Sequence, residues 1–169
     1  MSGQKRFDDI NFVVKANSIL ISMLEILGPD LEGRAGGYLV VADEKGLPVF
    51  LDRLGEIPEE KLNQYYTNAL EKALRLSHVQ QFAGHSLSRD SRDEKRQRWT
   101  GAAVGKNWIW SFSGFPEDCD EIFTVSLALG YGDLTHHEAC ARLRATGYEI
   151  VNPHFKKVDG FLRSLAGIR

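Results

Sequence analysis

Residues 108–130 have the sequence WIWSFSGFPEDCDEIFTVSLALG, which predicts a strand, a tight turn and a helix. The apolar run ends at Ser113-Gly114. Pro116 suits a first helical turn, because the N–H that proline lacks would be unpaired there. The acidic residues that follow favour the positive end of the helix dipole, and Gly130 is a typical helix stop. Because backbone N–H groups at such a turn lack helical partners, we expect a bound anion or polar ligand here.

Other helices and two hairpins surround this stretch. Apolar residues at helical spacing predict helices over 10–27 and 58–76, from Thr135 to a stop at Gly147, and beyond Pro153. Hairpins are predicted at 37–51, around an Asp-Glu-Lys-Gly turn, and at 99–112, around Gly105. Between them, the sign-alternating segment 88–98 is expected to form a solvated loop or a mobile hairpin tip. The order indicates an α+β fold, an antiparallel β-sheet with helices packed on it, as in profilin, GAF and roadblock domains.

Length and composition indicate one domain. A chain of 169 residues can bury about two-thirds of its unfolded surface, so residues 1–169 are expected to form one unit with a C-terminal helical extension from about 134. The net charge of −2 makes nucleic acid an unexpected partner. The polar N-terminus lacks a signal-peptide core, no run is expected to span a membrane, and the two cysteines suggest reduced thiols. These features predict a cytoplasmic protein.

Two groups of residues are candidates for ligand binding. Arg53, Lys72 and the Ser113-Gly114 turn could together hold a carboxylate or phosphate, because cationic donors complement turn amides. The alternative is that Arg53 pairs with nearby acids and Lys72 points into solvent. Trp108 and Trp110 share one face of the predicted strand and, with Trp99 and Phe112, could line an aromatic pocket or a dimer face, although part of that set is expected to be core.

Three short stretches in the same order resemble the GlcG/HbpS-like heme-degrading-domain family, over about residues 37–130. Val40 to Gly46 resembles that family's first hairpin, with its Asp-x-x-Gly turn, and Arg53 takes the place of an Arg that follows it. Ala69 to Ala73 is similar to its helix with a Lys-Ala pair, and Ser113-Gly114 followed by Asp120-Glu121 is similar to its Ser-Gly turn before an Asp-Glu helix. The resemblance implies a profilin-like fold, a tendency to oligomerise, and binding of heme or another small molecule in some members.

Histidines and cysteines are the candidates for heme or metal ligation. His78 and His85 flank the end of the second predicted helix, and either could be an axial heme ligand. His136 and His137 can each share a helix face with Cys140, a spacing compatible with a soft metal or heme, although both also fit the first turn of a capped helix. Cys119 follows an anion-friendly helix start, which favours a reactive thiol; the alternative is a buried structural thiol.

Three functions remain as hypotheses. The first is a small-molecule-binding or sensory domain, with heme or an anionic metabolite as its ligand. The second is an oligomerising scaffold of the roadblock type, and in either case a homo-oligomer is expected. The third is an enzyme that acts on heme or a small acid, for which the sequence offers no nucleophile–base pair and no convincing metal-ligand cluster.

Overall fold

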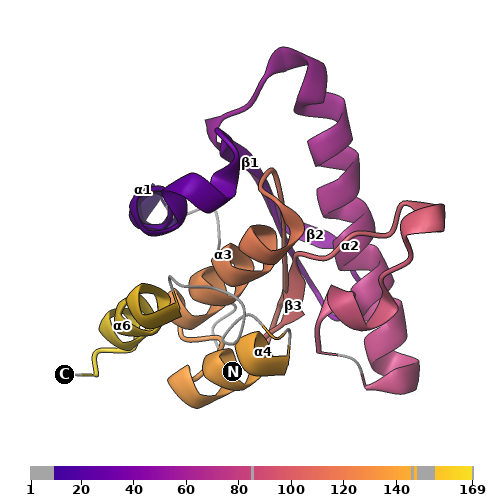
Figure 1. Cartoon of the computed structure of the whole chain (residues 1–169). Coiled ribbons are helices and arrows are strands. Elements are labelled where there is room, and N and C mark those ends of the chain that lie inside the picture. The colour runs from indigo at the N-terminus through magenta and orange to yellow at the C-terminus, as the bar shows by residue number, and fades with distance from the viewer. Residues whose placement is uncertain (1–9, 85, 146, 148–154, 169) are drawn as a thin grey trace.

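The computed structural model describes residues 10–84, 86–145, 147 and 155–168 (Figure 1). Its centre is a four-stranded antiparallel sheet in the order β2-β1-β4-β3. Five α-helices and four short 3-10 helices are present among the described residues. The strands are β1 (Ala35–Ala42), β2 (Pro48–Glu56), β3 (Ala102–Val104) and β4 (Ile109–Ser113), and the helices are α1 (Ile10–Leu27), η1 (Gly28–Leu31), η2 (Glu59–Lys61), α2 (Leu62–Ala83), η3 (Ser88–Ser91), η4 (Glu94–Arg96), α3 (Glu117–Gly130), α4 (His136–Ala145) and α6 (Phe155–Leu165). The predicted α+β fold, an antiparallel sheet with helices packed on it, is confirmed.

Strand alternation explains how one sheet serves two layers of helices. Val40 and Ala42 face α2, whose Ala69 and Ala73 allow a close approach, and Leu39 and Val41 face the opposite side. Figure 1 shows α2 on one side of the sheet and α1 and α3 on the other. Because both faces are covered, β1 is a nearly continuous apolar run.

The C-terminal helices thicken the side of the sheet that α1 and α3 cover. Val158 and Leu162 of α6 belong to the same apolar cluster as Phe123 of α3. The predicted capping box at the start of α4 is present: the Glu138 N–H donates to Thr135 Oγ1 at 3.2 Å, and the Thr135 N–H donates to Glu138 Oε2 at 2.7 Å. These two reciprocal hydrogen bonds fix the first turn of α4.

The charged segment 88–98 is exposed over much of its length, and Asp93 and Arg98 form an antiparallel bridge as in a hairpin tip, but the segment also makes contacts that its composition does not predict. It contains η3 and η4, and Arg75 of α2 donates to the carbonyl oxygens of Ser88 at 2.9 Å and Trp99 at 2.5 Å. Arg89 and Arg92 pair with acidic side chains near the start of α3. The segment's cations meet acids from a distant part of the chain, and local composition does not show this pairing.

Helix α1 corrects a sequence-based expectation. Residues 10–31 form a helical stretch that is long and apolar enough to cross a membrane by length and composition, although no run of that length was expected. A third of that stretch is buried inside the domain, where Phe12 and Met23 enter the core. The helix carries apolar residues on its outer face as well. A cytoplasmic location stays a prediction.

Candidate ligand-binding site

The turn between β4 and α3 is closed by a carboxylate of the chain itself. Asp120, in the first turn of α3, accepts hydrogen bonds at Oδ1 from the backbone N–H groups of Gly114, at 3.1 Å, and Phe115, at 2.7 Å. Its Oδ2 accepts a hydrogen bond from Lys72 Nζ at 2.8 Å, and the same ammonium donates to the Phe112 carbonyl at 2.9 Å. The turn amides that we expected a ligand to occupy are therefore occupied by Asp120.

Lys72 fits neither sequence-based expectation. Its side chain is 1% exposed and that of Asp120 is 4% exposed, so Lys72 neither points into solvent nor presents a free charge. Burial raises the pKa of Asp120 to about 6, against the opposing effects of Lys72 and the two turn amides. Lys72 and the turn do lie together, as predicted, but the carboxylate that they hold is the side chain of Asp120.

The next residue of α3 is a second buried acid. Glu121 accepts a hydrogen bond at Oε2 from Arg89 Nε at 2.8 Å, and no described residue donates to its buried Oε1. Burial raises the pKa of this carboxyl to about 7, although Arg89 opposes the shift. Two adjacent acids of α3 thus each depend on one cation from another element.

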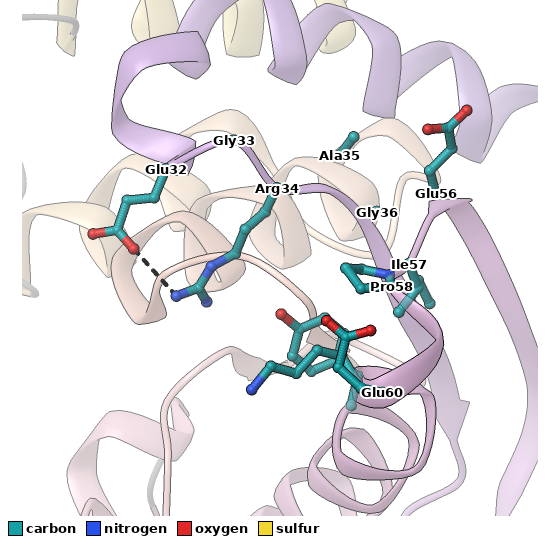
Figure 2. A pocket seen from close by; sticks show the side chains of 11 residues that line it. Glu32, Gly33, Arg34, Ala35, Gly36, Glu56, Ile57, Pro58 and Glu60 are labelled. Atoms are coloured by element: carbon teal, nitrogen blue, oxygen red, sulfur yellow. Dashed lines mark hydrogen bonds and ion pairs between the residues drawn. The ribbon is translucent and has the colours of Figure 1, made fainter.

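Two hollows lie beside this turn and share the side chains of Arg34 and Tyr65. The smaller, which we call the turn hollow, has a volume of about 270 Å³ and lies between α2 and the β4–α3 turn. The larger, the Arg34 hollow, has a volume of about 500 Å³ and lies between the start of β1 and the segment that leads into α2 (Figure 2). Besides Arg34 and Tyr65, the turn hollow is lined by Gln64, Asn68, Lys72, Trp99, Ser113, Phe115, Pro116, Glu117 and Asp120.

The turn hollow offers both hydrogen-bond donors and an acceptor. Arg34 is half-buried, and its one ion pair with a described residue joins Nη2 to Glu32 Oε2 at 3.1 Å, while a guanidinium carries five N–H groups. Figure 2 shows the Arg34 side chain extending into the space between Glu32 and Glu60. Glu117 uses Oε2 to accept from Arg92; its Oε1 has no partner among the described residues but is closed off from solvent, while the side chain as a whole is 27% exposed. A ligand with one carboxylate and one donor would match Arg34 and Glu117.

Arg53, the arginine expected at this site, lies elsewhere. It is an exposed residue of the edge strand β2, opposite Tyr38 of β1, and it lines neither hollow. Arg34 supplies the guanidinium instead. The sequence gives no signal for this choice, because Arg34 follows a Gly in a connecting turn and becomes part of the site only when α2 packs across the sheet.

The tryptophans separate into core and site. Trp110 is fully buried, its Nε1 donates to Asp133 Oδ2 at 2.8 Å, and its ring packs in the α1 and α3 layer. Trp108 is partly buried against the same cluster, and Phe112 is buried within it. Trp108 and Trp110 therefore border neither of the two hollows, and only Trp99 of the four aromatic candidates borders the turn hollow.

The three candidate histidines that the structure describes do not converge on one site. His78 is exposed on α2, whereas His136 and the exposed His137 lie on α4, across the sheet (Figure 1). His85 lies outside the described residues. No histidine borders either hollow, so the described residues do not fit histidine-ligated heme at this site.

Cys119 has a protonated, buried thiol. Burial raises its pKa to about 12, and the nearby carboxylates of Asp30 and Asp120 act in the same direction. Burial thus outweighs the lowering of the thiol pKa that a helix start favours. Cys119 is the buried structural thiol that we gave as the alternative.

Comparisons with protein-family models, curated proteins and solved structures find no significant match to this chain. The resemblance to the GlcG/HbpS-like family stays a prediction. The site must therefore be interpreted from its own geometry.

Proposed function

We propose that this protein is a small-molecule-binding domain whose turn hollow takes a small organic acid that also carries a hydroxyl or amino group. The observation that carries the proposal is that the half-buried Arg34 guanidinium and the partly exposed Glu117 carboxylate line the same hollow. An arginine fork suits a carboxylate, and a carboxylate acceptor favours a ligand with a donor. The ligand would be an anionic metabolite.

The size and charge of the hollow support a compact ligand. Its volume of about 270 Å³ lies just below the usual range for drug-sized ligands, and Lys72 and Asp120 close its inner wall as a neutral pair. Because the turn amides are already occupied, the ligand's carboxylate would bind Arg34 rather than the helix start. This arrangement favours hydroxy acids and amino acids over phosphates.

The test is binding of glycolate, lactate and serine, each compared with its uncharged amide, by calorimetry and by thermal shift. We expect saturable binding of at least one acid, no binding of its amide, and a loss of affinity of about tenfold or more in Arg34→Gln, because a charge-assisted hydrogen bond contributes about 1.5–3 kcal/mol. Arg53→Gln is the matched control, because Arg53 lines neither hollow. Equal effects of the two arginine variants, or no binding of any acid, would overturn the proposal.

A hemin titration tests the ligand that the family resemblance implies. Because no histidine borders the turn hollow or the Arg34 hollow, we expect no heme to bind in either; His78 lines a separate hollow of about 500 Å³ beside α2 and is the described candidate ligand that the titration tests. A saturable change in the Soret band that is lost when His78, His85, His136 or His137 is replaced singly by Ala would instead favour heme.

The outer face of α1 favours a second candidate function, an oligomerising scaffold. Ile10, Val14 and Ile21 are 75%, 63% and 58% exposed, and their spacing places them along one side of the helix. A helix that is apolar on both faces is typical of one that is covered on both. We expect a second copy of the chain to cover this stripe. A monomeric mass by light scattering, unchanged in Ile21→Asp, would exclude this role.

A further inference from the structure

His136, Cys140 and Asp159 bring an imidazole nitrogen, a thiol sulfur and a carboxylate oxygen together between α4 and α6, with all ligand atoms within 4.8 Å of one another. His136 Nε2 lies 3.4 Å from Cys140 Sγ and 3.6 Å from Asp159 Oδ1, and the sulfur lies 3.8 Å from the same oxygen. We propose that these three side chains bind a divalent transition-metal ion, with Zn²⁺ as the best match.

The triangle has the size that a tetrahedral zinc site requires. Bonds of about 2.0–2.3 Å at tetrahedral angles place neighbouring ligand atoms about 3.3–3.6 Å apart. The observed separations of 3.4 and 3.6 Å already lie in this range, and only the sulfur–oxygen separation of 3.8 Å must shorten slightly. A mixed set of nitrogen, sulfur and oxygen ligands suits Zn²⁺ better than the hard cations Mg²⁺ and Ca²⁺, which prefer oxygen alone.

The surroundings hold two of the ligands in place. His136 and Cys140 are four residues apart on α4, and the capping box of Thr135 and Glu138 fixes the helix turn that carries His136. Asp159 uses Oδ2 to accept a hydrogen bond from Arg163 Nε at 3.0 Å, which leaves Oδ1 directed toward the histidine and the thiol. Such an outer-sphere partner is typical of a metal-binding carboxylate.

The same geometry argues against a catalytic triad. In a triad, the histidine uses one ring nitrogen for the nucleophile and the other for the acid. Here Nε2 is the ring nitrogen nearer to the Cys140 sulfur, at 3.4 Å against 3.9 Å for Nδ1, and it also lies 3.6 Å from Asp159. The three atoms therefore surround a common point, as metal ligands do, rather than forming a chain.

The site would join the C-terminal helix to the domain and retain an open coordination position. His136 and Asp159 are 18% and 28% exposed at their side chains, so an ion has access from solvent. His137 is exposed, and consecutive residues of a helix point in different directions, so it does not complete the set. With three protein ligands, the fourth position would hold water or a further ligand.

The test uses the full chain, freed of metal with a chelator and then titrated with Zn²⁺ against a chromophoric competitor. We expect one equivalent per chain, and a thiolate-to-cobalt charge-transfer band when Co²⁺ replaces Zn²⁺. Both signals should be lost in Cys140→Ser, and Zn²⁺ affinity should fall about tenfold or more in Asp159→Asn. The matched control is His137→Ala, whose side chain is exposed beside the site.

A structural readout separates loss of ligands from loss of fold. At the same Zn²⁺ concentration, the melting temperature of the parent chain and of His137→Ala should rise more than that of Asp159→Asn. The proposal is overturned if the parent chain takes up no Zn²⁺. It is also overturned if Cys140→Ser and Asp159→Asn, with parent-like circular dichroism, bind as tightly as the parent.

Discussion

Replacing Lys72 by Met should show what the buried ion pair contributes to folding. Met has a similar length, so the change removes the charge without creating a large cavity. It leaves the Asp120 carboxylate, 4% exposed, with two amide donors and no cation, and frees the Phe112 carbonyl. Removing one partner of a buried pair typically costs about 3–5 kcal/mol, and we expect a loss in this range at about pH 8.

The pH dependence of this loss identifies its cause. The folded-state pKa of Asp120 is raised from 3.8 to about 6, so its contribution to stability is greatest at low pH and falls as the pH rises through that value. Without Lys72 the pKa should rise further, because only burial and the two amides remain. The Lys72→Met chain should then keep losing about 1.4 kcal/mol per pH unit above about pH 6, where the parent chain's Asp120 is already ionised.

Urea unfolding followed by tryptophan fluorescence measures both effects, because Trp110 lies in the core. Glu121 titrates in both chains, so its contribution cancels in the difference between them. The double variant Lys72→Met with Asp120→Asn should be more stable than Lys72→Met alone, since no charge is left buried. The reasoning is refuted if Lys72→Met costs less than about 1 kcal/mol at about pH 8, or if its cost is the same at about pH 5.

Three further changes test separate features of the fold. The folded-state pKa of Glu121 is raised from 4.5 to about 7, so its ionisation removes up to about 3 kcal/mol of stability as the pH rises through this window. Glu121→Gln should therefore flatten the profile of unfolding free energy against pH. An unchanged profile would show that Glu121 does not cause this pH dependence. Thr135→Ala should cost about 1 kcal/mol in thermal unfolding through loss of the α4 cap, and no change would show that the capping box is dispensable. Asp133→Ala removes the acceptor of the Trp110 indole and of the Asn107 amides and should cost about 3 kcal/mol, with a shift in tryptophan emission; a stable variant with parent-like emission would contradict this role.

The fold was predictable where local periodicity decides it. The turn before Gly46 and the capping residues Thr135 and Glu138 have local signatures, and the structure contains each of them. The sheet with helices on it follows from the order of these elements. The long-range contacts of segment 88–98 were not predictable, because its arginines pair with acids of α3 and no local pattern reports on partners at that distance.

The site was predictable only in part, for the same physical reason. The sequence identifies Lys72 and the Ser113-Gly114 turn, which do meet, but not that Asp120 lies between them. Arg34 becomes part of the site only because α2 packs across the sheet. Asp159 joins His136 and Cys140 from another helix, so sequence spacing could reveal only two members of that cluster.

Position 120 decides what the β4–α3 turn can accept. With aspartate there, the chain carries its own substitute for a bound anion, tethered to α3 and held by Lys72 and two amides. A related chain with glycine or alanine at this position would instead present the ammonium and both amides to a carboxylate-sized vacancy, open to an anion from solution. The residue four positions after the proline of a Ser-Gly-Phe-Pro turn therefore distinguishes a closed turn from a receptive one.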